Sequence, residues 1–352
     1  MKNSPIRCRF GTLFFITILF ILLPGTSQSL PDLPDNYLDY PVLLMSKEGT
    51  TGSGFFYNKD DATYLITARH VLFQETSVRV PEKFEVPKTL SHKFYVQEDK
   101  EKREFILYFY GVMLESERNE LMKAAPKSDQ DQFNFKEAIE KLYKESQKLK
   151  LRSNEITLFS YAPKNFGDGV NKCEVQLTKL FESGQVKYHP SQDVAFIRIG
   201  NLKKDADQQV VTVRRDWLTC EQVKGIFGLG QDNFKLLRDV IVGNPVFVFG
   251  YPTSITGINP WLNIKLPLLR KGIIAGKNED LRAIILDCPA FYGNSGGLVI
   301  EVERTTLTET QYKAIGLITN FVPYKIDWFQ NSGYSVVVPM DFVLELITGQ
   351  NK

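Results

Sequence analysis

Three short segments occur along the chain in the order His, Asp, Ser, and this order constrains the fold more than any other feature of the sequence. They are Tyr-Leu-Ile-Thr-Ala-Arg-His ending at His70, Gln-Asp-Val-Ala-Phe-Ile around Asp193, and Gly-Asn-Ser-Gly-Gly centred on Ser295. A Ser hydroxyl is a poor nucleophile at neutral pH, so it needs an imidazole to take its proton and a carboxylate to orient that imidazole. A fold that uses these residues must bring all three to one place.

Each of the three residues lies in a local context that suits this chemistry. His70 follows an apolar segment, residues 64–66, that is typical of a buried strand, and residues 52–57 are expected to form the other arm of a hairpin. Asp193 precedes a second alternating apolar run. Ser295 lies among glycines, whose backbone freedom lets N–H groups close on a substrate carbonyl oxygen.

On these residues the chain resembles the chymotrypsin-like serine peptidases, and it is most similar to the bacterial HtrA/Deg-type trypsin-like domains. Other similar segments are Gly52-Ser53-Gly54 before the His strand, and residues 244–252, 269–275 and 333–339. The resemblance implies an all-β fold of two six-stranded barrels, with the active site in the cleft between them. The residues after Pro339 suffice for a short helix at 341–347, and no PDZ domain is expected.

The resemblance also implies a role for each residue of the triad. His70 would be the general base, Asp193 its orienting carboxylate and Ser295 the nucleophile. The backbone N–H groups of Gly293 and Ser295 would form the oxyanion hole.

Two other hydrolase folds use the same residue types in a different order. The serine segment also fits the G-x-S-x-G elbow of α/β-hydrolases, but that fold places its His after its Ser. All three histidines of this chain, His70, His92 and His189, precede Ser295. A subtilisin-like order needs an Asp before the His, and the candidates at 60–61 lie in a turn-like stretch. We interpret His92 as a surface residue and His189 as part of the loop before Asp193.

The same resemblance places a primary specificity pocket. In the family, the residue six positions before the nucleophile lies at the base of this pocket, and here it is Pro289, with Ala290 beside it and a wall from Ile318-Thr319-Asn320. An Asp at the base would select Arg or Lys, and Pro289 carries no charge. Burial of an aliphatic side chain contributes about 1 to 3 kcal/mol, so we expect cleavage after Val, Leu, Ile or Ala.

The spacing between His70 and Asp193 is 123 residues, several times that of an HtrA-type domain. It predicts a partly helical insertion in the first barrel at about 81–187, with a charged hairpin at 94–113 and a helix that places Phe135, Ile139 and Leu142 on one stripe. A helix packed against the side of the barrel is favoured, and a substrate lid or a partner surface remains the alternative. The first barrel is expected at about 40–200 and the second at about 240–345, within a peptidase domain at 30–352.

The N-terminus has the composition of a secretory signal peptide, expected over residues 1–29. Three basic residues precede an apolar stretch from Phe10 to Leu23, and small residues suited to cleavage follow it up to Ser29. The stretch is short for a membrane-spanning helix. We therefore expect a periplasmic or secreted protein, with a membrane anchor only if this segment is not cleaved.

Charge and composition argue against several classes of partner. Removal of residues 1–29 changes the formal net charge from +2 to −1, which leaves no basic field for nucleic acid. The sequence has no metal-ligand spacing and no nucleotide-binding motif, so no cofactor is expected. Cys173, Cys220 and Cys288 remain after cleavage, enough for one disulfide and one free thiol, and the sequence does not assign the pair.

Two functional classes follow from the sequence. The favoured one is a serine endopeptidase that hydrolyses polypeptides through an acyl-enzyme intermediate. The alternative is a binding or scaffold protein of the cell envelope that kept the peptidase fold with weak or no catalysis. Leu298, which stands where the family usually has Pro, and the insertion favour this alternative. The ordered triad favours the enzyme.

Overall fold

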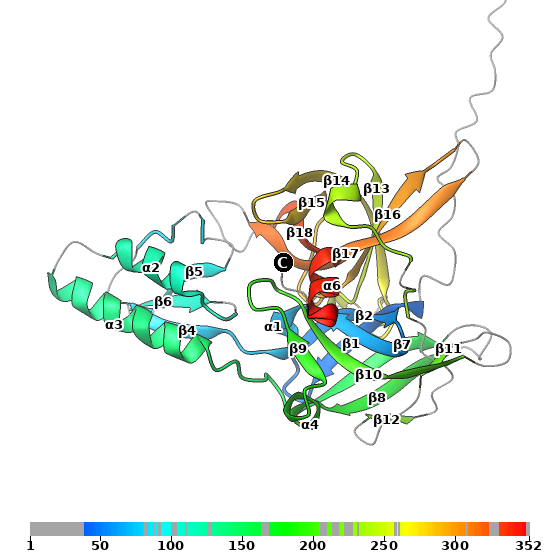
Figure 1. The fold of residues 1–352 in the computed structure, drawn as a ribbon, viewed down its shortest axis with the longest axis horizontal. Helices are drawn as coiled ribbons and strands as arrows, with labels where there is room; N and C mark the ends of the chain where they lie inside the picture. Colours follow the sequence, from blue (N-terminus) through cyan, green and yellow to red (C-terminus); the bar gives the residue numbers. More distant parts are fainter. Residues whose placement is uncertain are drawn as a thin grey trace, which may run out of the picture. The chain divides into compact units, whose positions relative to one another are not determined.

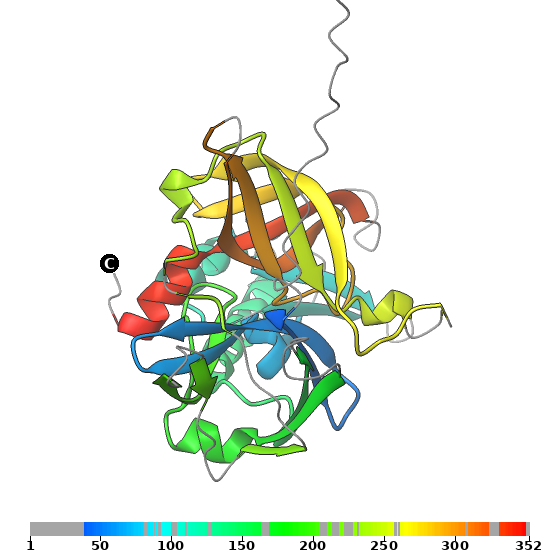
Figure 2. The same ribbon diagram turned by 90° about the vertical axis from the view of Figure 1, so that its right-hand side faces the viewer.

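A computed structural model describes residues 39–349, apart from 81–83, 88, 91–92, 100–103, 110, 126–128, 163–168, 205–209, 213–217, 222–227, 231, 257–258, 260, 307–308 and 324–330. The described residues belong to one compact unit, Asp35–Lys352. They form a half-barrel, a closed barrel and a small separate module (Figures 1 and 2). The expected signal peptide at 1–29 and His92 lie outside the described residues.

The half-barrel is a nine-stranded antiparallel sheet built mostly from the first part of the chain. Its order is β11-β10-β3-β2-β1-β7-β8-β12, with β9 paired to β10. Apolar side chains on both faces of β1, β2 and β3 are buried, which suits strands at the centre of a sheet. The strands are β1 (Pro41–Ser46), β2 (Thr51–Lys59), β3 (Ala62–Thr67), β7 (Glu155–Ala162), β8 (Gly169–Gln176), β9 (Val186–Tyr188), β10 (Ala195–Lys204), β11 (Val210–Thr212) and β12 (Leu218–Glu221).

The second sheet closes into a six-stranded barrel of order β13-β14-β15-β18-β17-β16. Alternate residues of each strand point inward, so Val246 and Val248 of β13 pack with Ile284 and Leu286 of β15 in one core. Closure leaves no free sheet edge. The strands are β13 (Pro245–Gly250), β14 (Leu268–Asn278), β15 (Ala283–Asp287), β16 (Leu298–Arg304), β17 (Thr310–Pro323) and β18 (Asn331–Pro339).

A half-barrel with a closed six-stranded barrel matches the two-barrel fold that the sequence predicted, so the predicted fold class is confirmed. Short helices complete the two sheets. They are α1 (Arg69–Leu72), α4 (Leu177–Glu182), the 3-10 helix η3 (Leu237–Asp239), α5 (Thr253–Thr256) and α6 (Met340–Thr348). In the described part of the chain, no helix has the length and apolar character needed to cross a membrane.

The insertion forms a module with its own hydrophobic core. Three strands, β4 (Thr76–Val80), β6 (Glu104–Phe109) and β5 (Phe94–Asp99), pair in that order, and α2 (Glu115–Lys123) and α3 (Asp129–Ser146) accompany them (Figure 1). The predicted stripe of α3 is buried in this core. The core includes Val78, Leu90, Phe94, Leu107, Phe109, Leu121, Phe135, Ile139 and Leu142.

The module is shorter than the insertion that the sequence predicted at 81–187. Strand β7 pairs with β1, and β8 pairs with β7, so residues 155–176 belong to the half-barrel. The separate module therefore spans residues 76–146. The pairing of β7 with β1 joins segments more than a hundred residues apart, and such a long-range register is not visible in local periodicity.

The chain enters and leaves the module at one point, which we call the stem. The Gln74 N–H donates to the Lys150 carbonyl at 2.8 Å, Phe73 forms a bridge with Leu151, and the Arg152 N–H donates to the Leu72 carbonyl at 2.8 Å. The stem follows α1 directly. The module is therefore joined to the half-barrel next to the helix that carries His70.

Candidate active site

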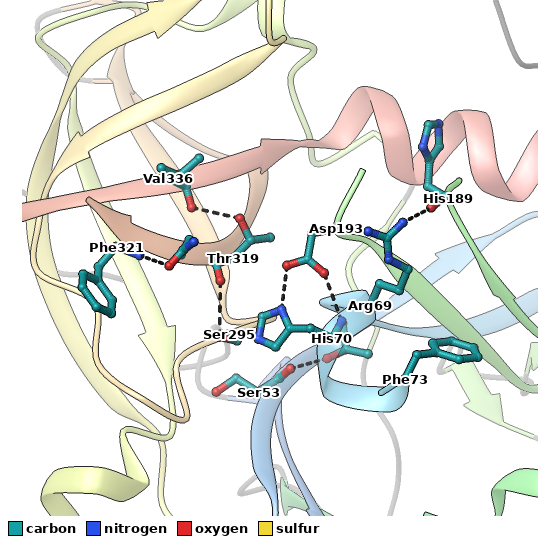
Figure 3. A network of polar contacts seen from close by, with 12 residues as sticks. Ser53, Arg69, His70, Phe73, His189, Asp193, Ser295, Thr319, Phe321 and Val336 are labelled. Atoms are coloured by element: carbon teal, nitrogen blue, oxygen red, sulfur yellow. Dashed lines mark hydrogen bonds and ion pairs between the residues drawn. The ribbon is translucent and has the colours of Figure 1, made fainter. Parts of the chain in front are cut away.

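Two paired strands bring His70 and Asp193 together. His70 lies in α1 just after β3, and Asp193 lies just before β10, which pairs with β3. The Asp193 Oδ2 atom is 2.6 Å from His70 Nδ1, and Oδ1 accepts the backbone N–H of His70 at 3.0 Å (Figure 3). An ionised carboxylate only accepts hydrogen bonds, so the Nδ1 atom carries the proton and Nε2 keeps the lone pair that a base requires.

A buried arginine lies next to this pair. Arg69 is 3% exposed, and its Nη1 donates to the carbonyls of His189 at 2.6 Å and Pro190 at 3.1 Å. Burial by itself would raise the pKa of Asp193, but His70 and then Arg69 oppose it, and the pKa lies below its ordinary value. Asp193 is therefore ionised at neutral pH.

Ser295 lies in the turn before β16, and this turn packs against β2 and the end of β3, just before the helix that carries His70. The Ser295 carbonyl accepts the Ser53 N–H at 2.7 Å. Gly296 has φ +89°, and a Cβ atom there would lie 2.0 Å from the Ser53 carbonyl oxygen and 3.0 Å from the Ala68 nitrogen, so only glycine fits. Figure 3 shows the His70 imidazole between Asp193 and Ser295. The Ser295 hydroxyl donates to the Thr319 carbonyl at 3.4 Å.

The carbonyl groups of the turn at 292–295 all accept hydrogen bonds. Their partners come from three different places in the chain, Ser53, Ser254 and Gly297. The Tyr292 carbonyl accepts the Ser254 N–H and hydroxyl, the Gly293 carbonyl the Ser53 hydroxyl at 2.6 Å, the Asn294 carbonyl the Gly297 N–H at 2.8 Å, and the Ser295 carbonyl the Ser53 N–H.

The N–H groups of residues 293–297 divide into two sets. Those of Asn294, Gly296 and Gly297 donate to backbone carbonyls, whereas those of Gly293 and Ser295 have no partner among the described residues. The N–H and C=O of a trans peptide point in opposite directions, so Ser254 directs the Gly293 N–H by holding the Tyr292 carbonyl. Two such N–H groups, one residue apart and near a serine hydroxyl, can stabilise the negative oxygen of a tetrahedral intermediate.

The residues predicted for the specificity pocket divide between the barrel core and the surface. Ala290 and Ile318 are buried in the core of the closed barrel, and Thr319 is buried beside Ser295. Pro289 is exposed, with its carbonyl accepting from Arg270 at 3.0 Å, and Asn320 is exposed as well. The structure therefore places Pro289 at the surface, between the buried Cys288 and Ala290.

Sequence reasoning missed several residues that hold this site. Arg152 donates from Nε to the carbonyls of His70 at 2.7 Å and Phe73 at 3.0 Å, which fixes the end of α1. The Tyr292 side chain is 68% exposed, and its ring lies edge-to-face with that of Phe321. Ser53 lies in the Gly52-Ser53-Gly54 segment that the sequence analysis singled out, whereas Arg152 and Tyr292 lie in no such segment. Contacts between distant residues leave no local pattern.

The described cysteines are not candidates for nucleophilic chemistry. Cys288 is a buried free thiol, and burial raises its pKa, which opposes formation of the thiolate. Cys173 is disulfide-bonded, and the strand register places it directly opposite Cys220. Among the described residues, no group of three or more His, Cys, Asp or Glu side chains could hold a metal ion.

Comparisons with known proteins found likeness in solved structures alone. No family model and no curated protein matches the chain. The chain is similar to an HtrA-type protease AlgW solved with a tripeptide, at 12% identity and a TM-score of 0.40, covering 89% of this chain and 60% of that chain. It is also similar to a thermostable serine protease AL20 from an extremophilic microorganism, at 10% identity and a TM-score of 0.39. This match covers 87% of this chain and 93% of that chain. Human heparin binding protein is similar at 8% identity and a TM-score of 0.36, covering 89% and 93%.

Proposed function

We propose that the protein is a serine endopeptidase with His70 as general base, Asp193 as its orienting carboxylate and Ser295 as nucleophile. One observation carries the proposal. Asp193 holds both the backbone and the imidazole of His70, while a turn with two unpaired N–H groups holds Ser295 against Ser53 of β2, close to Ala68 just before the same helix. Neither feature is needed for a purely structural site.

The reaction follows from the roles of these groups. The Ser295 hydroxyl turns from the Thr319 carbonyl, gives its proton to Nε2 of His70 and attacks the substrate carbonyl. The N–H groups of Gly293 and Ser295 stabilise the resulting oxyanion. The imidazolium then protonates the leaving amine, and water attacks the acyl-enzyme by the same route. Asp193 stays ionised throughout and stabilises the imidazolium.

We further propose that the substrates are unfolded polypeptides with an aliphatic residue before the cleaved bond. The residues assigned to the pocket carry no charge, which favours an uncharged substrate side chain. The proposed location is the periplasm or the exterior of the cell. A disulfide at Cys173 supports it, since disulfides persist in oxidising compartments.

The alternative is a binding protein that kept the peptidase fold. The donation of the Ser295 hydroxyl to Thr319 favours this alternative, because its proton then points to a carbonyl group and not to a base. Leu298 does not favour it. This residue is fully buried in β16 and pairs with Leu317, so it packs within the barrel.

The Ser295→Ala variant tests the proposed nucleophile. We expect casein hydrolysis by the mature protein to fall about 10⁶-fold in kcat, because the triad acts as a unit. Labelling by a fluorophosphonate, which reacts only with an activated serine, should disappear as well. Mass spectrometry of the casein fragments should find most cuts after Val, Leu, Ile or Ala.

The matched control is Ser183→Ala, which removes a hydroxyl at the end of α4 and should change neither readout. Equal hydrolysis by the wild-type and Ser295→Ala proteins would show that Ser295 is not the nucleophile. A wild-type protein that neither cuts casein nor takes the label would establish the binding alternative. Cuts mainly after Arg or Lys would overturn the pocket assignment alone.

A further inference from the structure

Ser53 makes four hydrogen bonds and is fully buried. Its hydroxyl donates to the Gly293 carbonyl at 2.6 Å and accepts the Tyr251 N–H at 2.9 Å. Its N–H donates to the Ser295 carbonyl at 2.7 Å, and its carbonyl accepts the Thr67 hydroxyl at 2.7 Å. Strand β2, which carries Ser53, thus meets both the serine turn and the end of β13 through one residue.

Two of these bonds fall on the residues that supply the proposed oxyanion donors. The hydroxyl of Ser53 holds the carbonyl of Gly293, and its N–H holds the carbonyl of Ser295. The peptide between Gly293 and Asn294 is thereby bonded on both sides, because the Asn294 N–H donates to Phe291 at 2.9 Å. This peptide separates the two unpaired N–H groups, so its orientation sets their spacing.

The surroundings of Ser53 leave the turn little freedom to adjust. A Cβ atom on Gly250 would lie 3.3 Å from the Ser53 hydroxyl and 3.3 Å from the Asn294 side chain. A Cβ atom on Gly293 would lie 2.3 Å from the Tyr251 carbonyl oxygen. The Tyr251 segment, the serine turn and Ser53 are therefore in close contact, and the hydroxyl joins them by donating to Gly293 and accepting from Tyr251.

We infer that the Ser53 hydroxyl is a positioning residue for the oxyanion hole, holding the Gly293 and Ser295 N–H groups at the spacing that the transition state requires. The inference rests on the proposed function. It assigns a role to the Ser53 hydroxyl alone. The bond from the backbone N–H to Ser295 is a separate contact, which any amino acid except proline at this position would supply. Its removal should therefore weaken the binding of the transition state more than the binding of the substrate.

Ser53→Ala and Ser53→Cys test this inference, because a thiol keeps the shape of the side chain but is a weak donor. We expect kcat on a fluorogenic peptide to fall about 10- to 100-fold per active site in both variants, with KM changed less than about 2-fold. The inhibition constant of a peptide aldehyde, which forms a tetrahedral adduct, should rise by the same factor. Exhaustive fluorophosphonate labelling counts the active sites in each preparation.

Ser160→Ala is the matched control, since it truncates another buried serine of the same sheet, far along the chain from the serine turn. A purely structural role of Ser53 predicts fewer active sites and a lower melting temperature, with kcat per site and aldehyde affinity unchanged. That result, in either Ser53 variant, would overturn the inference and leave the proposed function intact. A wild-type protein that reacts with neither reagent would overturn both.

Discussion

At the residue scale, His189 fixes the turn that leads to Asp193. Its Nδ1 accepts the N–H groups of Ser191 at 3.3 Å and Gln192 at 3.1 Å, so the ring proton lies on Nε2, which is 3.5 Å from Glu345. Burial lowers the pKa of His189 more than Glu345 raises it, and Arg69 and Arg282 lower it further. A protonated ring would lose its acceptor, so this turn needs a neutral histidine.

This arrangement predicts a pH dependence of stability. The folded-state pKa of His189 lies below the unfolded value of about 6.5, so its contribution is present in full above pH 6.5 and is lost as pH falls through the folded pKa. His189→Asn keeps an acceptor oxygen that does not titrate. Thermal melts should show a smaller loss of Tm between pH 7.5 and pH 5.5 in this variant than in the wild type.

The range from pH 7.5 to pH 8.5 serves as an internal control, because His189 is neutral throughout it. Wild type and variant should respond alike there. An equal acid sensitivity of the two proteins would mean that His189 is not the titrating group.

The three residues proposed as the triad could be singled out from the sequence because their order and their glycine-rich or apolar flanks are local features. Ser53, Arg69 and Arg152 could not be assigned their roles in this way. Their partners lie about 80 to more than 200 residues away in the chain, and a hydrogen bond across that distance depends on strand pairing rather than on neighbouring residues. His189, interpreted from the sequence as a loop residue, does lie in that loop, and its contacts with Glu345 and Phe342 of α6 could not be read from the sequence.

At the element scale, Gly111 joins the module to the site. It follows β6, has φ +121°, and a Cβ atom there would lie 2.3 to 2.9 Å from the guanidinium group of Arg69. Arg69 could move aside only by giving up its buried bonds to the carbonyls of His189 and Pro190. The backbone of the module therefore forms one wall around the arginine beside Asp193.

Gly111→Ala and Gly49→Ala separate this contact from backbone strain. Both glycines have positive φ, but a Cβ atom on Gly49 meets nothing within 4 Å. Urea denaturation should give a loss of about 1 to 2 kcal/mol for Gly49→Ala, from strain alone, and about 2 to 4 kcal/mol for Gly111→Ala. The turnover of Gly111→Ala should also decrease, since Arg69 holds the residues before Asp193. Equal losses of stability would argue against the contact.

The sequence predicted the elements better than their connections. The hairpin at 94–113 contains β5 and β6, and the stripe of Phe135, Ile139 and Leu142 forms the buried face of α3, because both depend on local periodicity. The bounds of the insertion differed, since β7 and β8 have the same local pattern as module strands. Only their pairing with β1 assigns them to the half-barrel.

At the scale of the whole molecule, α6 contacts β10 of the half-barrel and β17 and β18 of the closed barrel. Phe342 of this helix is 3% exposed, with its ring 5.1 Å from that of His189 and the Arg282 guanidinium 4.1 Å above it. Arg282, which follows β14, also pairs with Glu345 at 2.7 Å. One helix thus packs against both sheets.

Truncation of this ring should destabilise both sheets together. We expect Phe342→Ala to lower the free energy of unfolding by about 3 to 5 kcal/mol, with a single transition in both fluorescence and circular dichroism. Phe133→Ala removes a ring that is 67% exposed on α3 and should stay within about 0.5 kcal/mol of the wild type. Two separated transitions in Phe342→Ala would mean that the sheets unfold independently.

The stem also bears on the order in which the chain folds. Pairing of β3 with β10 joins segments on either side of a 123-residue separation, and closing so long a loop slows folding. The module has its own core, and Gln74 and Lys150 meet at its base. Once the module has folded, a loop of some seventy residues is already closed, and the path from β3 to β10 is shortened by that loop. The insertion can therefore be long without delaying the assembly of the strands that carry His70 and Asp193.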